Sequence, residues 1–287
     1  MGRRISFILS TLRRCRETRS GAAAAVACLI ALSASAQAPS DRALRESAED
    51  IPRWPDGRVN LQAAPGETGI WEGRAPAALA FTVSDGEAVA SQWDLKTNLR
   101  IDDVPFKPWA RGLYEYRRAT LGKDDPHTKC KPSGGPRMWH TPYGIEIIDR
   151  PQTQEVIIIG VGGPHSWRVV HMDGRPHPEN PRPTWFGHTI GRWEGDTLVM
   201  DTVGFNERFW LTREGIPYTS SLHLVERVTR TDRHTLVYEA TIDDPLTYDE
   251  VWSGGWTLAW LDGVEPFEYI CQDNNFDPQH MVGPGGA

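Results

Sequence analysis

The stretch Trp185–Phe205, WFGHTIGRWEGDTLVMDTVGF, contains the clearest structural pattern in the sequence. Its centre, Gly195-Asp196, favours a two-residue hairpin turn, and the residues on both sides alternate between apolar and polar character. A turn at this dipeptide pairs Trp193 with Leu198 and sets the register of both strands. The stretch therefore predicts an antiparallel β-hairpin.

One face of this hairpin carries the first candidate site. Side chains of a strand alternate between its two faces, so Asp201 shares a face with His188 and Arg192 and lies diagonally opposite both. Arg192 would keep Asp201 ionised, and Asp201 would orient His188 as a proton donor or acceptor. We take these three residues as catalytic candidates, and a structural ion pair on a solvated face is the alternative.

The chain from Tyr143 to Tyr269 has the same character, with short apolar runs between turn dipeptides. Connections this short favour antiparallel hairpins. We predict a mostly β protein, with a single antiparallel barrel-like or sandwich domain and one short amphipathic helix over 108–121. The predicted strands are Ile145–Asp149, Glu155–Val161, Ser166–Met172, Thr184–Glu194, Thr197–Gly204, Leu222–Thr231, Thr235–Asp243 and Trp256–Leu261.

The N-terminal residues indicate export. Six arginines precede a short run of small and aliphatic residues that ends in Ala34-Ser35-Ala36, a small-x-small cleavage site. We predict a signal peptide over 1–36, an extended N-terminal arm over 37–104, and the β domain with its leading helix over 105–287. The mature protein would be periplasmic or secreted, with no integral membrane segment left after cleavage.

Charge and cysteine content fit that location. The formal charge is −7 with a mean hydropathy of −0.47, which disfavours nucleic-acid binding and a multi-spanning membrane protein. Cleavage would leave Cys130 and Cys271, and an oxidising compartment favours a disulfide between them. Two free buried thiols are the alternative.

A second predicted hairpin and two residue groups supply further candidates. With a turn at Asp232-Arg233, Glu226 would face Glu239. Two opposed carboxylates make either an acid pair with a raised pKa, which would make Glu226 a catalytic candidate, or a solvent-facing pair without a catalytic role. We expect no metal site. The weaker alternative is a metal site with His171, Asp173 and His177 as its ligands. The chain has 12 Trp, of which several can line a ligand pocket instead of the core. The ligand-binding candidates are Trp139, Trp185 and Trp256.

Several cofactor and enzyme signatures are missing from the sequence. It has no P-loop, no complete dinucleotide-binding glycine motif, no G-x-S-x-G and no H-E-x-x-H. We therefore expect no organic cofactor.

The motif Gly191–Val199, GRWEGDTLV, resembles that of a large family of exported, uncharacterised bacterial proteins. The similarity extends to Pro55–Arg58, Lys123–Pro126, Cys130 and Asp173–Pro176. This resemblance implies export and a β-rich fold, and it implies no reaction or catalytic residue.

Two functions remain open from the sequence. The first is an acid/base hydrolase or lyase that acts on a small glycoside or polar-aromatic compound through His188, Asp201 and Arg192. The alternative is a non-enzymatic, periplasmic ligand-binding or envelope-associated β-barrel module. Both require a small-molecule partner, and the oligomeric state is undetermined.

Overall fold

The structure, a computed structural model, describes residues 51–74, 77–162, 166–273 and 275–276. The predicted signal peptide over 1–36 lies outside the described residues. No helix in the described ranges is both long and apolar enough to cross a membrane.

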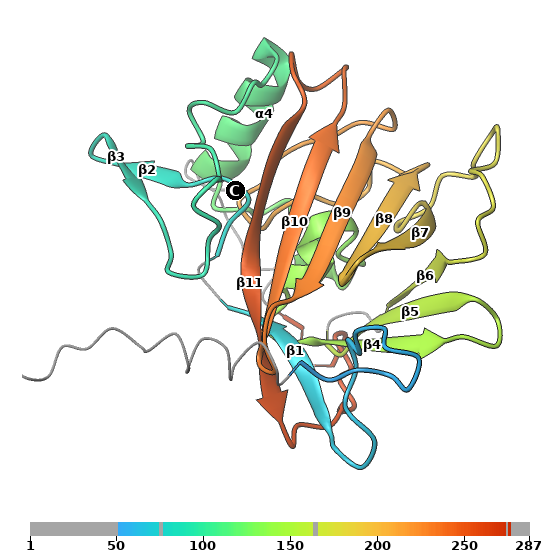
Figure 1. Cartoon of the computed structure of the whole chain (residues 1–287). Coiled ribbons are helices and arrows are strands. Elements are labelled where there is room, and N and C mark those ends of the chain that lie inside the picture. Colours follow the sequence, from blue (N-terminus) through green and yellow to red (C-terminus); the bar gives the residue numbers. More distant parts are fainter. Residues whose placement is uncertain (1–50, 75–76, 163–165, 274, 277–287) are drawn as a thin grey trace, which may run out of the picture. The chain divides into compact units, whose positions relative to one another are not determined.

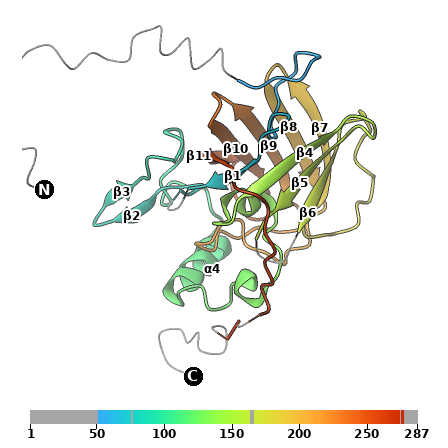
Figure 2. The ribbon, with the colours of Figure 1, turned by 90° about the horizontal axis from the view of Figure 1, so that it is seen from below.

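Nine strands form a closed barrel in the order β1-β11-β10-β9-β8-β7-β6-β5-β4, and β1 closes it by pairing with β4 (Figures 1 and 2). A hydrophobic core fills the interior. The barrel strands are β1 (Gly69–Gly73), β4 (Ile145–Arg150), β5 (Glu155–Gly160), β6 (Trp167–His171), β7 (His188–Glu194), β8 (Thr197–Val203), β9 (His223–Arg230), β10 (Thr235–Asp243) and β11 (Trp252–Asp262).

The remaining elements are short. A separate two-stranded sheet pairs β2 (Thr82–Ser84) with β3 (Glu87–Val89). One α-helix, α4 (Pro108–Ala119), and two 3-10 helices, η1 (Pro126–Lys129) and η2 (Gly135–His140), come between β3 and β4. Figure 1 shows α4 at one end of the barrel. The mostly β fold predicted from the sequence is confirmed as a barrel.

The register predicted for the Trp185–Phe205 hairpin is confirmed. Trp193 pairs with Leu198 in the β7–β8 ladder. Gly195 has a φ of 60°, a conformation that the first turn residue of a two-residue hairpin requires and that glycine adopts readily.

One pair departs from the predicted antiparallel pattern. Strands β6 and β7 run parallel, with Val170 opposite Thr189 and His171 opposite Ile190. The connection over 172–187 is long enough to carry the chain back along the barrel, which a tight turn is not. We refer to residues 172–187 as the crossover loop.

The predicted boundary at residue 104 does not separate an arm from the barrel. Within 37–104, β1 supplies a barrel strand and pairs with β11 over its whole length. Its neighbouring residues Ile70 and Trp71 are both buried, so both faces of this strand are covered. The sequence of β1 is too short to show a clear period.

The helix α4 forms at the predicted position with a different buried face. The i, i+7 spacing of Trp109 and Tyr116 predicts that both lie on the buried face, but both side chains are about half exposed, and Ala110 and Tyr114 are buried instead. Tyr114 stacks on Phe106, with ring centroids 5.6 Å apart. Packing against the preceding segment therefore determines which helix face is buried.

The predicted disulfide is present. Cys130 and Cys271 are bonded, with Cα atoms 5.7 Å apart, within the usual range for a disulfide. The bond ties the segment after β11 to the loop that follows η1. Disulfides persist in oxidising compartments, so the bond indicates a location outside the cytoplasm.

Candidate functional site

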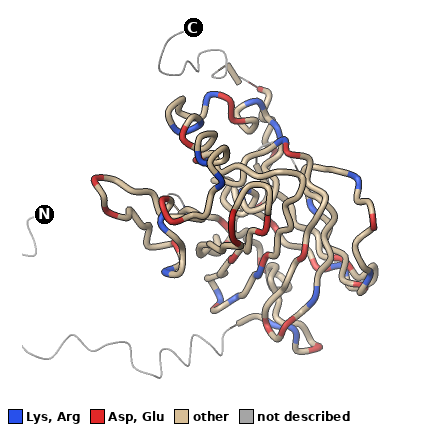
Figure 3. Tube along the Cα trace, turned by 90° about the horizontal axis from the view of Figure 1, so that it is seen from above, with Lys and Arg blue, Asp and Glu red and all other residues tan. Residues whose placement is uncertain are grey.

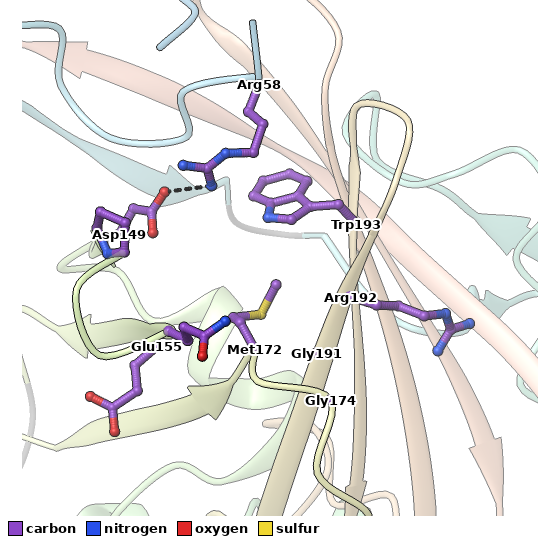
Figure 4. Close-up of a pocket in the computed structure, with 10 residues that line it drawn as sticks. Arg58, Asp149, Glu155, Met172, Gly174, Gly191, Arg192 and Trp193 are labelled. Carbon is purple, nitrogen blue, oxygen red and sulfur yellow. Dashed lines mark hydrogen bonds and ion pairs between the residues drawn. The ribbon is translucent and has the colours of Figure 1, made fainter. Parts of the chain in front are cut away.

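A cleft of about 410 Å³ opens at the end of the barrel that carries the β4–β5 and β7–β8 turns (Figure 4). We call it the rim cleft. Its walls come from segments far apart in sequence, namely the N-terminal segment before β1, the β4–β5 hairpin, the start of the crossover loop and β7. The lining residues are Arg58, Asp149, Pro151, Gln154, Glu155, Met172, Gly174, Gly191, Arg192 and Trp193.

An ion pair and an indole lie side by side in the rim cleft. Arg58 donates from Nη1 to Asp149 Oδ2 at 2.9 Å and from Nε to Asp56 at 2.8 Å. These carboxylates, the Asp56 hydrogen bond foremost, raise the pKa of Arg58. Figure 4 shows the Trp193 indole beside the Arg58 guanidinium and the Met172 thioether across the cleft. The cleft thus combines one flat aromatic ring with fixed polar groups.

The two other charged residues of the rim cleft face elsewhere. Arg192 bonds to Glu194, with Nη2 2.6 Å from Oε1, and Figure 4 shows its guanidinium turned away from the cleft. Glu155 is paired with Arg150 at 3.2 Å. Neither side chain therefore contributes its charged group to the cleft centre.

Asp149 and Glu155 are the carboxylates of the rim cleft, and they lie on opposite faces of the β4–β5 hairpin. Asp149 pairs with Val156, which is buried in the barrel, so its side chain belongs to the inner face. Glu155 precedes Val156 and therefore belongs to the outer face. The cleft does not hold two facing carboxylates of the kind that glycoside hydrolysis uses.

The predicted catalytic group around Asp201 is assembled differently from the expectation. Asp201 accepts hydrogen bonds from His177 Nε2 at 3.0 Å and from His223 Nε2 at 2.8 Å. His188 reaches it only through His177, with the two Nδ1 atoms 2.9 Å apart. Arg192 belongs to the Glu194 pair. Asp201, His177, His188 and His223 therefore form one chain of hydrogen bonds, which we call the Asp201 cluster.

The Asp201 cluster lies on the outer face of the barrel, partly exposed. Burial raises the pKa of Asp201, but the hydrogen bonds from His177 and His223 outweigh it and lower that pKa overall. Burial also lowers the pKa of His188, as do His177 and His171 when charged. The arrangement stabilises an ionised carboxylate and a neutral imidazole at neutral pH.

His177 and His223 are not among the predicted partners of Asp201. His177 comes from the crossover loop, and a loop's path over a sheet cannot be read from residue spacing. The strand pattern can reveal His223, because it lies on the strand next to β8 and two positions from Val225, the residue opposite Asp201, and therefore on the same face.

The metal alternative lacks a common centre. Asp173 bonds to Arg175, which holds the pKa of that carboxyl at about 2, while His177 bonds to Asp201. No group of three metal-ligating side chains converges within the described ranges. In the Asp201 cluster, the His177 ring separates Asp201 from His188.

Glu226 lies inside the barrel, and its predicted partner is wrong. The β9–β10 register places Glu226 opposite Ala240, and Glu239 opposite Arg227. The turn is one residue longer than predicted, because Thr231 N bonds to Thr235 O across three turn residues. The one-residue shift separates the two carboxylates.

The actual partners of Glu226 are an arginine and two aromatic residues. Its Oε2 is ion-paired with Arg168, and its Oε1 accepts from Trp139 Nε1 and Tyr238 OH, both at 2.9 Å. Glu226 is fully buried and Arg168 nearly so. This network anchors η2 inside the barrel and is closed to a substrate.

The predicted ligand-binding tryptophans do not line the rim cleft. Trp139 and Trp256 are buried in the core, and Trp185 packs against it. Trp256 also lines a small cavity with Arg137 and His140. Trp193 is the tryptophan of the rim cleft. The sequence feature that could have identified Trp193 as a cleft residue is its inward-facing position at the end of a predicted strand.

The comparisons with protein-family models, with curated proteins and with solved structures give no match to this chain.

Proposed function

We propose that this chain is an exported ligand-binding β-barrel module that holds a small hydroxylated ring compound, such as a glycoside or a phenolic compound, in the rim cleft. The observation that carries the proposal is the Trp193 indole beside the Arg58–Asp149 ion pair. A flat indole suits the apolar face of a sugar or aromatic ring. Guanidinium and carboxylate groups supply donors and acceptors for hydroxyls at the ring edge.

The charge of the rim cleft favours a neutral ligand. Arg58 already has two carboxylate partners, Asp56 and Asp149, so its charge is compensated. A strongly anionic ligand would compete with both carboxylates. Hydroxyl groups, in contrast, can accept from the guanidinium and donate to Asp149 while the ion pair stays in place.

Binding is better supported than hydrolysis at this cleft. Its carboxylates lie on opposite faces of their hairpin, and Arg192 is hydrogen-bonded to Glu194. The proposal therefore takes the non-enzymatic alternative of the sequence as the first function. Periplasmic or secreted location is part of it, supported by the disulfide and by the export signal in the sequence. Membership of the exported β-rich family is also part of the proposal and is supported by the GRWEGDTLV hairpin.

The Asp201 cluster favours one second candidate, an acid/base enzyme. With neutral rings, His177 donates from Nε2 to Asp201, so its Nδ1 accepts a hydrogen bond from Nδ1–H of His188, and Nε2 of His188 is left as the basic nitrogen. An imidazole oriented by a second imidazole and a carboxylate is a competent general base. This cluster would act on a substrate at the outer face of the barrel.

Titration calorimetry with a panel of neutral glycosides and phenolic compounds tests the binding proposal. We expect saturable binding by the wild type, and an affinity about tenfold lower in Trp193→Ala, because the aromatic contact is lost. Trp167→Ala is the matched control, since Trp167 is exposed and outside the cleft. If Trp193→Ala binds the same compound equally well, the cleft is not the site.

The same panel separates the second candidate. Product analysis after incubation with wild type and Asp201→Asn distinguishes an enzyme from a binding module. Chemical change that Asp201→Asn abolishes, in a variant that melts like the wild type, would favour the enzyme. Unchanged compound with both proteins favours the binding module.

A further inference from the structure

Three arginines surround a second pocket, at the C-terminal end of α4 and away from the barrel end that holds the rim cleft. The pocket has a volume of about 260 Å³ and is lined by Arg117, Arg118, Leu121, Gly122, Arg213 and Glu214. Figure 3 shows basic positions in blue along the coil of α4 and the loops next to it. The chain as a whole is acidic, with a formal charge of −7, so a concentration of arginines is a local feature.

Arg117 is held in place without a carboxylate. Its guanidinium lies over the Trp210 ring, 4.6 Å from the centroid, and its Nη1 donates to Gly215 O at 3.0 Å. Burial lowers the pKa of Arg117 to about 10, which shows that its charge is poorly solvated. Gly215 has a φ of 97°, and a Cβ there would lie 2.8 Å from the Arg117 side chain, so glycine permits this packing.

The other two arginines are exposed at the pocket. Within the described ranges, the side chains of Arg118 and Arg213 have no hydrogen bond or ion pair, and no ion pair includes Arg117. Most other arginines of the described chain are paired with a carboxylate, as Arg58, Arg137 and Arg168 are. The one acidic side chain of the pocket is Glu214.

We propose that this pocket binds a phosphoryl group, carried by a small phosphorylated compound or by a lipid headgroup. A phosphate monoester carries a charge between about −1.5 and −2 at neutral pH and has three acceptor oxygens, which matches several guanidinium donors. A carboxylate has one charge and two oxygens and would leave more of the donors unsatisfied. The volume exceeds that of a phosphoryl group alone and leaves room for part of the compound attached to it.

Glu214 tunes this pocket in the proposal. Its negative charge repels a bound phosphoryl group, so it lowers the affinity of the pocket for that group. Replacement of this carboxylate by an amide of the same shape is therefore expected to strengthen phosphate binding, whereas a purely structural role for the arginines predicts no such gain.

Titration calorimetry of the oxidised protein with inorganic phosphate and with glucose 6-phosphate tests the free-ligand source. We expect saturable binding that weakens with added salt, at least about tenfold weaker in Arg118→Gln/Arg213→Gln, because two charge-assisted contacts are lost. Glu214→Gln should bind more tightly. Arg111→Gln is the control, because it removes one charge from the same helix outside the pocket.

Sedimentation with vesicles tests the lipid source. Vesicles that contain phosphatidic acid are compared with vesicles of phosphatidylcholine alone, with the same variants. Binding to soluble phosphates or to phosphatidic acid that requires Arg118 and Arg213 supports the proposal and identifies the source. Failure of both, or an equal loss in Arg111→Gln, overturns it.

Discussion

Nε2 of His177 lies 3.0 Å from Oδ1 of Asp201, and this bond joins the crossover loop to the outer face of β8. His177 also contacts His188, so it bridges two strands from the loop side. The same loop begins with Met172 and Gly174, which line the rim cleft. The Asp201 cluster and the rim cleft therefore share one structural support.

Replacement of His177 should loosen that support. In His177→Phe the crossover loop loses both imidazole hydrogen bonds, so we expect faster amide hydrogen exchange over 172–187 than in the wild type. Ligand affinity at the rim cleft should fall with it. His234→Phe is a suitable control, because His234 is exposed and bonds to Asp262 elsewhere. Equal exchange in His177→Phe and wild type would show that other contacts hold the loop.

Acid should destabilise the protein through its histidines. Burial is the main cause that lowers the pKa of His188, His127 and His140 from the usual 6.5. The unfolded chain then binds protons at higher pH than the folded chain does, so stability is present above pH 6.5 and is lost as pH falls below it toward the folded pKa values. Denaturant unfolding at a series of pH values measures this loss.

The share of His188 in that loss can be isolated. We expect a shallower decline in His188→Gln than in the wild type between pH 7 and about 5. Identical slopes in the two proteins would mean that His188 titrates at the same pH in the folded and unfolded chains.

The buried charge of Glu226 should be essential for stability. Glu226→Gln leaves Arg168 without its ion-pair partner in the barrel interior, and the loss of one partner of a buried pair costs about 3–5 kcal/mol. Glu239→Gln on the outer face of the next strand should change stability by less than about 0.5 kcal/mol. Urea unfolding of both variants gives the two values, and similar effects would contradict the assignment of Glu226 to a closed interior network.

The disulfide should contribute to stability as well. It closes a loop with a sequence separation of 141, and the chain-entropy argument gives a contribution of about 5 kcal/mol. Thermal unfolding of the wild type and of Cys130→Ala/Cys271→Ala, each without reductant, measures the difference. Equal melting temperatures would indicate that the folded state does not depend on this bond.

The two hairpins show what the sequence can predict. The Gly195-Asp196 turn has two residues and requires a backbone conformation that glycine favours. The position of this glycine therefore predicts the position of the turn, and the turn fixes the whole β7–β8 register. The β9–β10 turn has three residues and carries no glycine. A two-residue turn at Asp232-Arg233 shifts the predicted register by one residue and pairs Glu226 with Glu239 instead of Ala240.

The sites depend on contacts between segments far apart in the chain. Arg58 and Asp149 are 91 residues apart in sequence, and Arg168 and Glu226 are 58 apart. No periodicity relates such positions, because barrel closure brings them together. The local sequence pattern therefore identifies Asp201, His188 and Glu226 as unusual residues. Their partners can be identified only from the folded structure.

Fluorine NMR of the protein labelled with 5-fluorotryptophan tests whether a bound ligand contacts Trp193 in the rim cleft. The resonance of Trp193 is assigned by its disappearance in Trp193→Phe, and that of exposed Trp167 serves as the internal control. We expect a glycoside or phenolic ligand found by calorimetry to shift the Trp193 resonance saturably and to leave the Trp167 resonance unchanged. A ligand that binds the protein while the Trp193 resonance stays in place would show that the rim cleft is not its binding site.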